Sequence, residues 1–568
     1  MSNFDLIIRN GTLVDGSGGP PYEGDLAIAN GKIVGIGNVT GVSARELDAR
    51  DKLVTPGFVD IHTHYDGQAL WDPHLAPSAW HGVTTAIMGN CGVGFAPCRA
   101  DDREKLVALM EGVEDIPAPV MHQGLKWNWS SFPEYLDALD ERPRDIDVGA
   151  LLPHAAVRVF VMGDRALDLQ NALPSDIEKM RKIATEAVRA GAMGFSTSRT
   201  TSHRSLAGDY IPTLRAQEQE LTQIALGLAD AGSGYMEVVS EWNYPDVLTE
   251  FAMLRRIAQT SGRNVLFSCT EHHTKASFWD QLLAQANAAK QAGISMRPVC
   301  APRAIGILLG LESSQNPFSA TPTYKSVARL PLKERVAAMR NPDTRAKILS
   351  EDPRAGSTFP LFHRLSYSQM YVFGNPPDYE PKPQQSLQVI ADQRGCTPQE
   401  LAYDIMVEGD GTNFIYAPLS NYKSLDLSAC EAMLADPISI MGLGDGGAHV
   451  GCILDAGFPT WVLSYWGKTR KRFTVQELVR RLTSDTAGAA GLRDRGMLRV
   501  GMKADVNIID YEKIGLGQPY TTHDLPAGGQ RLLQKASGYD ATIVSGVVTY
   551  RHGEATGALP GRLVRGQR

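Results

Sequence analysis

Short apolar runs alternate with longer amphipathic stretches along most of the chain. The runs are bounded by turn residues, as expected of buried strands, and the stretches between them repeat apolar positions at helical spacing. The runs lie at 84–88, 148–152, 193–196, 234–239, 265–269, 294–299 and 438–444, and the helical windows at 175–190, 215–231, 247–261 and 279–292. This alternation predicts an α/β fold with a parallel sheet and enough units to close a (β/α)8 barrel. Periodicity alone also permits an open, doubly wound sheet.

A different pattern marks the two ends of the chain, where single apolar positions alternate with polar ones and glycines supply tight turns. Such alternation is typical of short antiparallel strands. We expect these strands at 4–13, 25–36, 505–509 and 541–550. The two ends therefore predict one small β-sandwich, formed by residues 1–55 and 490–568, beside a barrel of residues 56–489. Two unrelated β caps are the alternative.

The strand and helix alternation breaks down at about 303–378, in a region that contains many prolines and arginines. We expect a helix within it at 331–340, and helical periodicity resumes at 385–408. Long insertions in barrel loops are commonly functional, so this segment is a candidate lid. A peripheral embellishment of the fold is the alternative.

Composition narrows the range of partners. The chain has 568 residues, of which 43% are hydrophobic and 21% charged, and a net charge of −7. These are ordinary globular values, and the negative balance supplies no general basic face for nucleic acid or an anionic membrane. We therefore expect a small-molecule substrate, no nucleic-acid partner and no membrane partner. The sequence leaves open whether several copies assemble into a homo-oligomer.

The first residues and the cysteines indicate where the protein works. Met1–Asn10 contains the acidic Asp5 and only a short apolar run, unlike a signal peptide, and no apolar run is long enough to span a membrane. Seven cysteines without framework spacing fit reduced thiols better than disulfides. We expect a cytoplasmic protein.

The stretch Val54–Asp66 carries the first candidate chemistry. A turn signal precedes a short apolar run that ends in His62-Thr63-His64. Side chains of a strand alternate between its faces, so His62 and His64 point the same way. Two neutral imidazoles on one face form a chelating pair for Zn²⁺. For an isolated His-x-His motif, satisfied core histidines would be the commoner explanation.

The run Pro56–His64 resembles the first strand of the amidohydrolase superfamily, whose members are metal-dependent hydrolases on a distorted (β/α)8, TIM-like barrel. Within it, the chain is most similar to the N-acyl-D-amino-acid deacylase (D-aminoacylase) group. The turn Gly501–Asp505 also resembles one that follows the barrel in this superfamily, and the insertion at 303–378 is similar to the family's lid. The resemblance favours the barrel over the open sheet and a metal site over satisfied core histidines.

Further metal ligands are expected at the ends of later strands, because barrel active sites are built there. Cys91 lies in Gly89-Asn90-Cys91-Gly92, which matches a metal-binding motif of the D-aminoacylases; a small buried hydrophobe is the alternative. The fourth strand, at 190–197, lacks the bridging lysine of many amidohydrolases. The resemblance therefore implies a bridge supplied by Cys91, or one tight metal and one weak position.

The fifth and sixth strands depart from the family pattern. Glu237 occupies the position at which many members carry a histidine ligand, and a carboxylate can also bind Zn²⁺. Two histidines end the sixth strand slightly late, and His273 is the expected ligand. The predicted metal ligands are thus His62, His64, Cys91, Glu237 and His273, for one or two zinc ions.

Asp445 follows the last apolar run and stands among glycines that let a substrate come close. It resembles the eighth-strand aspartate of amidohydrolases, the general base that moves a proton from water to the leaving amine. An aspartate in an ordinary glycine-rich turn is the alternative. Arg199, His203 and His449 are expected to meet the substrate, although solvated surface positions would explain each singly.

These residues predict a metal-dependent hydrolase of an amide C–N bond, most like an enzyme that deacylates N-acyl-D-amino acids. Hydrolysis of another amide or a cyclic amide is an alternative, because the altered fifth and sixth strands reshape the pocket. A catalytically inactive scaffold or binding protein with a hydrolase fold is an alternative of another class. The joint presence of His62, His64, Cys91 and Asp445 argues against it.

Overall fold

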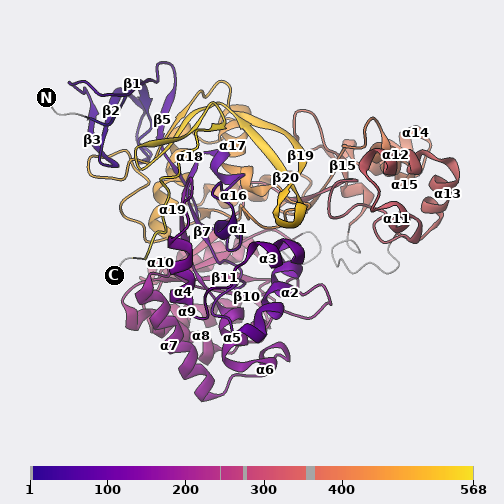
Figure 1. Ribbon diagram of the computed structural model, residues 1–568, viewed down its shortest axis with the longest axis horizontal. Helices are drawn as coiled ribbons and strands as arrows, with labels where there is room; N and C mark the ends of the chain where they lie inside the picture. Colours follow the sequence, from indigo (N-terminus) through magenta and orange to yellow (C-terminus); the bar gives the residue numbers. More distant parts are fainter. Residues whose placement is uncertain (1–3, 244, 273–277, 354–364, 567–568) are drawn as a thin grey trace.

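The computed structural model describes residues 4–243, 245–272, 278–353 and 365–566 (Figure 1). Its centre is a barrel of parallel strands, paired in the orders β6-β7-β8 and β9-β10-β11-β12-β13-β17. The strands are β6 (Phe58–Asp60), β7 (Val83–Met88), β8 (Asp147–Ala150), β9 (Leu152–Pro153), β10 (Gly194–Arg199), β11 (Tyr235–Ser240), β12 (Val265–Ser268), β13 (Met296–Cys300) and β17 (Ile440–Met441). The predicted α/β barrel is confirmed.

The barrel closes between its first and last strands. The His64 backbone N–H donates to the Gly446 carbonyl at 2.7 Å, and the Asp445 N–H donates to the His62 carbonyl at 3.1 Å. Only Leu151 separates β8 from β9, so the two short strands together occupy the place of one strand in the barrel. The closing hydrogen bonds therefore join the ends of β6 and β17, where the predicted site residues lie.

Each strand is buried on both faces, which explains the continuous apolar runs in the sequence. Inward-pointing residues such as Val59, Ile87, Leu266 and Val299 pack into one apolar cluster inside the barrel. Helices that follow the strands cover the outside: α5 (His154–Met162), α7 (Pro174–Ala190), α8 (Glu218–Ala231), α9 (Val247–Ser261), α10 (Trp279–Gln291), α16 (Ser428–Ala435) and α18 (Val475–Leu482). Since this apolar cluster fills the barrel, the polar side chains that could carry out chemistry lie at the strand ends.

Both ends of the chain contribute to one sheet. Its order is β23-β22-β21-β18-β5-β1-β2-β3, with β4 also paired to β1. The strands are β1 (Leu6–Leu13), β2 (Tyr22–Ala29), β3 (Lys32–Gly37), β4 (Glu46–Asp48), β5 (Leu53–Pro56), β18 (Val506–Ile509), β21 (Tyr539–Val544), β22 (Val547–Arg551) and β23 (Glu554–Ala555). They enclose an apolar core of their own. The domain boundaries 1–55 and 490–568 stay a prediction.

The last described residues leave this sheet and return to the barrel. The Val148 N–H donates to the Arg562 carbonyl at 3.0 Å, and the Val564 N–H donates to the Val148 carbonyl at 2.6 Å. The chain end therefore lies along β8. A long hairpin, β19 (Gly515–Leu525) and β20 (Gly529–Ser537), also departs from the terminal sheet.

A separate unit follows β13 and forms the right-hand lobe of Figure 1. It has its own apolar core, which includes Leu309, Phe318, Met339 and Leu401. Its elements are β14 (Ile305–Leu309), α11 (Pro322–Val327), α12 (Leu332–Arg340), α13 (Pro342–Ser350), β15 (Tyr371–Val372), α14 (Leu387–Arg394), α15 (Pro398–Val407) and β16 (Ile415–Ser420). The expected insertion at 303–378 lies within this longer unit, and its role as a lid stays a prediction.

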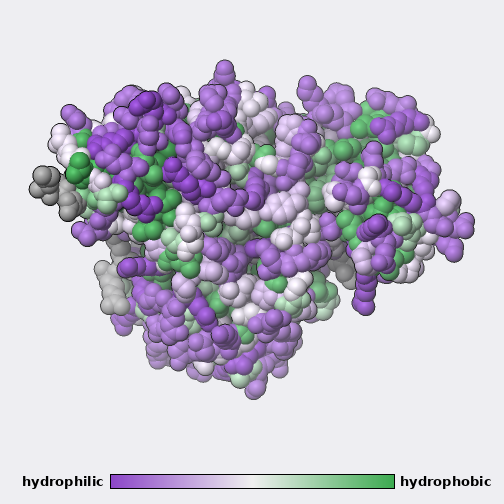
Figure 2. Space-filling model, turned by 45° about the horizontal axis from the view of Figure 1, so that its top comes forward, coloured by the Kyte–Doolittle hydropathy of each residue, from purple (hydrophilic) through white to green (hydrophobic). Residues whose placement is uncertain are grey.

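The surface is mainly hydrophilic on the face drawn in Figure 2, with apolar residues in scattered groups. Within the described ranges, we find no helix with the length and apolar character needed to cross a bilayer.

Candidate metal centre

His62 and His64 lie just beyond the end of β6 and point to the same side, as strand alternation predicts. Their residues are 2% and 1% exposed, so both imidazoles are withdrawn from water. The ring centroids are 5.6 Å apart. The Nε2 atoms of His62 and His64 lie 3.4 and 3.8 Å from Oδ1 of Asp445. One nitrogen of each ring thus faces the same carboxylate oxygen.

Cys91 enters this group from the turn after β7. Its backbone has a φ of 57°, in the left-handed region that non-glycine residues seldom adopt. Gly92 follows, and a Cβ there would lie 3.0 Å from the backbone of Thr197, so this neighbour must be small. The Cys91 Sγ lies 3.4 Å from Nε2 of His62. His62, His64 and Cys91 each offer a ligand atom, all within 4.8 Å of one another.

Asp445 is placed by the loop after β17, and its φ of 47° is again left-handed. Glycines on either side allow this turn. A Cβ on Gly444 would lie 2.8 Å from Oδ2 of Asp60, and one on Gly446 would lie 2.6 Å from Oγ of Ser78. Strained backbone at Cys91 and Asp445 is characteristic of functional sites, where the surrounding fold maintains it.

The donor set fits a divalent cation. Both ring nitrogens of His64 and Oδ1 of Asp445 are buried without a hydrogen-bond partner among the described residues. Buried polar atoms normally have such partners, so ring nitrogens and a carboxylate oxygen that face one another without one can accommodate a positive ion. Imidazole, thiolate and carboxylate are the ligands that Zn²⁺ takes in proteins. His62, His64 and Cys91 are the residues that would hold it, with the Asp445 carboxylate beside them.

Electrostatics support the same conclusion. Burial lowers the pKa of His62 to about 3, so its ring is neutral and has a free lone pair. Burial, with a smaller contribution from the charges of Asp455 and Asp60, raises the pKa of Asp445 to about 8. Burial also raises the pKa of the Cys91 thiol. A bound cation would favour the ionised forms of Asp445 and Cys91, because it supplies the charge that the apolar surroundings lack.

Glu237 points into the barrel from β11, as its predicted register requires. Its Oε2 accepts a hydrogen bond from the Cys91 N–H at 3.1 Å, and its Oε1 lies 3.9 Å from Nδ1 of His62. Burial raises the pKa of Glu237 to about 8. The carboxylate therefore lies behind His62 and Cys91, on the side away from Asp445.

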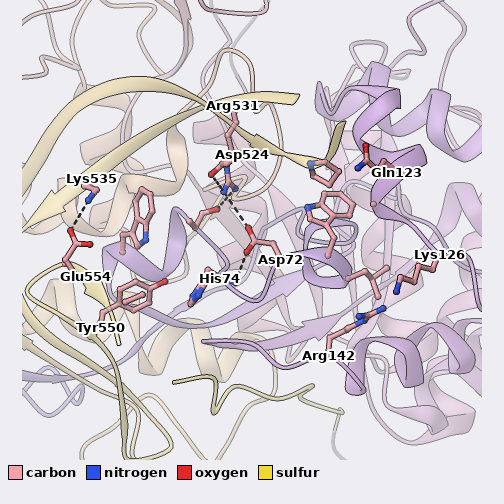
Figure 3. Close-up of a pocket in the computed structure, with 18 residues that line it drawn as sticks. Asp72, His74, Gln123, Lys126, Arg142, Asp524, Arg531, Lys535, Tyr550 and Glu554 are labelled. Carbon is pink, nitrogen blue, oxygen red and sulfur yellow. Dashed lines mark hydrogen bonds and ion pairs between the residues drawn. The ribbon is translucent and has the colours of Figure 1, made fainter. Parts of the chain in front are cut away.

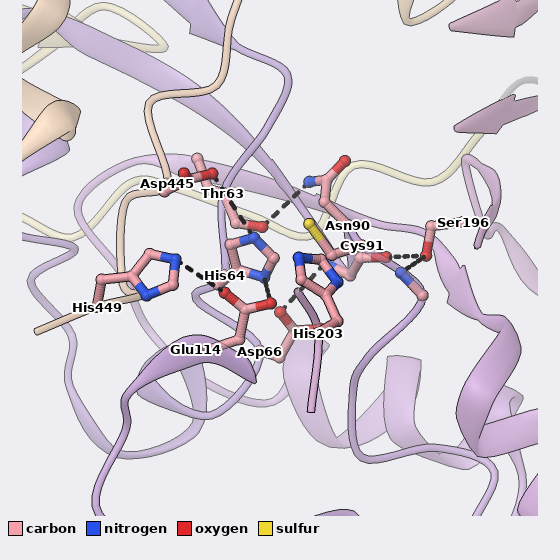
Figure 4. A network of polar contacts seen from close by, with 12 residues as sticks. Thr63, His64, Asp66, Asn90, Cys91, Glu114, Ser196, His203, Asp445 and His449 are labelled. Atoms are coloured by element: carbon pink, nitrogen blue, oxygen red, sulfur yellow. Dashed lines mark hydrogen bonds and ion pairs between the residues drawn. The ribbon is translucent and has the colours of Figure 1, made fainter. Parts of the chain in front are cut away.

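Glu114 is a site residue that the sequence did not reveal. It ends α2 (Arg103–Glu114), and its Oε1 lies 3.4 Å from Nδ1 of His64. Its Oε2 lies 3.8 Å from Nε2 of His449 (Figure 4). A glutamate at the end of an amphipathic helix matches no metal or catalytic motif, so no local signal could have identified it.

His203 and His449 lie in the same network and are more accessible than His62 and His64 (Figure 4). Nδ1 of His203 and Oγ of Ser198 form a hydrogen bond of 2.9 Å. Burial lowers the pKa of each ring to about 4. Both rings are therefore neutral near pH 7 and can donate or accept a hydrogen bond at the open side of the site.

The structure does not bring Arg199 to this centre. Alternation along β10 turns Ser196 and Ser198 toward the site and Arg199 toward the helices outside the barrel. Its Nε donates to Oε1 of Glu250 at 2.8 Å, and its Nη1 donates to the Ala216 carbonyl at 2.8 Å. The expectation of substrate contact is therefore replaced by a buried ion pair between β10 and α9. His273 lies outside the described residues.

A cavity of about 770 Å³ lies elsewhere, between the segment after β6 and the β19–β20 hairpin (Figure 3). Its lining includes none of the predicted site residues. Several of its charges are paired: Arg531 with Asp524 at 2.8 Å, and Lys535 with Glu554 at 3.0 Å. Because the atoms without a hydrogen-bond partner converge at the ends of the barrel strands instead, that end of the barrel is the candidate catalytic site.

Comparison with known proteins agrees with this geometry. The amidohydrolase family model matches residues 45–550. An uncharacterized protein of Mycobacterium tuberculosis is 28% identical over 98% of this chain and 93% of its own length. The N-acyl-D-glutamate deacylase of Alcaligenes xylosoxydans xylosoxydans is 26% identical over 100% of this chain and 97% of its own. The N-acyl-D-glutamate deacylase of Bordetella bronchiseptica, solved with zinc and a phosphonate inhibitor, is similar in structure, with a TM-score of 0.65. Its sequence is 21% identical, and the alignment covers 99% of this chain and 100% of that one.

The family match covers the barrel and part of the terminal sheet, because β1, β2 and β3 precede residue 45, and the deacylase relative spans the whole chain. The resemblance to the D-aminoacylase group is confirmed, and so is the expectation of a hydrolase. The chain belongs to the amidohydrolase family.

Proposed function

We propose that the protein hydrolyses the amide bond of N-acyl-D-amino acids, with one tightly held zinc ion. The observation that carries this proposal is the convergence of His62, His64, Cys91 and Asp445 on one buried point, where both ring nitrogens of His64 and Oδ1 of Asp445 have no hydrogen-bond partner among the described residues. When bound, Zn²⁺ polarises a carbonyl oxygen and makes a water acidic enough to ionise near pH 7.

In this proposal, Asp445 moves the proton. Its Oδ1 lies beside Nε2 of His62, at the open end of the barrel strands, where a water and the substrate carbonyl would meet. The carboxylate accepts a proton from that water and delivers it to the leaving nitrogen, as a general base and then a general acid. His62, His64 and Cys91 hold the ion, and His203 and His449 offer hydrogen bonds to the substrate from the open side.

The acyl-amino-acid substrate is supported by the full-length deacylase relative. Hydrolysis of another amide or a cyclic amide is the second candidate. Glu237 favours it, because it occupies the position at which, by the family resemblance, many members carry a histidine, and this changes the surroundings of His62 and Cys91. A scaffold without catalysis would require neither the ion nor Asp445.

All seven cysteines lie among the described residues as free thiols, which supports the proposal of a cytoplasmic enzyme. An assembly of identical copies stays open.

One experiment tests the function. Protein purified without chelator is analysed for bound metal and then assayed with a panel of N-acetyl-D-amino acids, with the L-enantiomers as controls. We expect bound zinc and hydrolysis of D-substrates. Bound metal without hydrolysis of any N-acyl amino acid would shift the assignment to other amides. A metal-free protein without activity would favour the scaffold.

A further inference from the structure

Glu114 has a carboxylate buried directly behind a metal-site histidine. The residue is 1% exposed, and its Oε1 has no hydrogen-bond partner among the described residues. That oxygen lies 3.4 Å from Nδ1 of His64, whereas Nε2 of the same ring faces Asp445 at 3.8 Å. The two nitrogens of His64 therefore face two different carboxylates, one in the catalytic loop and one at the end of α2 (Figure 4).

We propose that Glu114 is a positioning residue that fixes His64 for metal binding, and that the inserted unit after β13 holds Glu114 in place. The inference rests on the proposed metal-dependent function. A histidine ligand usually donates its second ring N–H to a carboxylate or carbonyl, which sets the tautomer and orientation of the ring. A proton on Nδ1 of His64, directed at Glu114, leaves the lone pair of Nε2 for the ion.

The end of α2 is itself held by two other parts of the chain. The next residue, Asp115, has a φ of 52° and ends the helix in the left-handed region. Its Oδ2 accepts hydrogen bonds from Oγ of Ser314 at 2.9 Å and from Sγ of Cys452 at 3.5 Å. Ser314 belongs to the inserted unit, between β14 and α11, and Cys452 belongs to the loop after β17.

Backbone contacts strengthen this link. The His449 N–H donates to the Glu114 carbonyl, and the Ser314 N–H donates to the Gly451 carbonyl at 2.8 Å. A continuous set of contacts therefore runs from the inserted unit through Asp115 and Glu114 to His64. A displacement of the inserted unit at Ser314 would act on Asp115, and so on the carboxylate that orients the metal ligand.

The first test measures zinc affinity, which does not depend on the substrate. Chelator-stripped protein is titrated with Zn²⁺ in competition with a chromophoric chelator. Loss of a carboxylate that orients a ligand typically weakens metal binding about 10- to 100-fold, so we expect this loss for Glu114→Ala. Glu114→Gln keeps the shape of the side chain and one acceptor oxygen, so its zinc affinity should fall less. Glu104→Gln removes an exposed charge from the same helix and should bind zinc like the parent.

Two further measurements separate positioning from a general effect on folding. Thermal melting of the metal-free proteins shows whether each variant is folded. If Glu114→Ala does not fold, the near-isosteric Glu114→Gln still tests the proposal. The visible spectrum of the Co²⁺-loaded protein reports ligand geometry, and we expect it to change in Glu114→Gln and to stay as in the parent for Glu104→Gln. Parental zinc affinity and an unchanged Co²⁺ spectrum in folded Glu114→Gln and Glu114→Ala would overturn the proposal.

The link to the inserted unit has its own variant. Ser314→Ala removes the hydroxyl that donates to Asp115, and we expect zinc binding weaker than in the parent but tighter than in Glu114→Ala. Parental affinity in Ser314→Ala would overturn this half of the proposal. Because these readouts need no substrate, a chain whose zinc affinity depends on Glu114 but which cleaves no N-acyl amino acid would retain the inference and refute the proposed substrate.

Discussion

Replacing Arg199 with methionine should destabilise the protein without changing substrate affinity. The guanidinium and the Glu250 carboxylate have side chains that are only 6% and 1% exposed, and Nε lies 2.8 Å from Oε1. Methionine has a similar length but no charge, so Arg199→Met leaves the Glu250 carboxylate buried with the Ser240 hydroxyl as a remaining donor at 2.9 Å. The loss of one member of a buried ion pair is among the larger single causes of instability.

The size of the effect follows from this burial. Removing one partner of a buried ion pair typically costs about 3–5 kcal/mol. If all 568 residues unfold as one unit, an unfolding entropy of about 2.1 cal/mol/K per residue converts this into a fall of about 2.5–4 °C in Tm. Unfolding of the barrel alone would give a larger fall, because fewer residues then share the same loss of free energy.

The assay compares melting temperatures of Arg199→Met, Glu250→Gln and the double variant. We expect the fall in melting temperature of the double variant to be smaller than the sum of the falls of the two single variants, because both members of the ion pair are then removed together. Arg256→Met is the matched control: Arg256 pairs with Glu218 at 2.7 Å, but the two side chains are 55% and 40% exposed. A surface pair of this kind contributes about 0–1 kcal/mol. Unchanged melting together with a raised KM in Arg199→Met would refute the outward orientation and restore a substrate role.

Two further predictions concern the metal centre. Asp445→Asn keeps the shape of the side chain but accepts no proton, so kcat should fall by at least about 100-fold while metal content, measured on the same preparation, barely changes; a variant within a few-fold of the parent would exclude Asp445 as the base. Cys91→Ser should lose zinc affinity, and Cys91 in the parent should resist iodoacetamide until a chelator removes the ion, as followed by mass spectrometry; equal alkylation with and without zinc would show that Cys91 is a packing residue.

The fold was largely readable from the sequence because both of its periodicities are strong. Apolar runs such as 84–88 and 265–269 are buried on both faces, and the helical windows between them became α7, α8, α9 and α10 within one or two residues at most ends. The insertion was harder to delimit. Its helices pack on each other around Leu309 and Leu401 rather than on the barrel, so their pattern gives no sign of where the barrel resumes.

Site residues could be predicted from the sequence where they lie next to the end of a strand. His62, His64, Cys91 and Asp445 each follow an apolar run directly, so barrel topology alone places them together. The expectation for Arg199 was wrong because the fourth strand, expected to end at 197, continues to Arg199, and strand alternation then directs this side chain outward. Glu114 was not accessible to such reasoning, since a helix end reaches the site only through tertiary packing.

The two histidines are oriented in the same way by unrelated parts of the chain. Nε2 of each ring faces Asp445, and Nδ1 of each ring lies near a buried glutamate, Glu237 on β11 for His62 and Glu114 on α2 for His64. In the proposed metal site, carboxylates behind His62 and His64 would raise the basicity of both rings toward the ion. This arrangement explains why buried glutamates, which would otherwise be expensive to bury, are present at the site.

The same strand ends also close the barrel. The hydrogen bonds from Asp445 N–H to the His62 carbonyl and from His64 N–H to the Gly446 carbonyl join β6 to the segment after β17. The side chains of His62, His64 and Asp445 face the proposed metal site, while their backbones form the seam between the first and last strands. An ion held by His62 and His64 beside Asp445 would therefore lie where the two sides of the seam meet. The proposed metal binding and the closure of the barrel would therefore depend on the same residues.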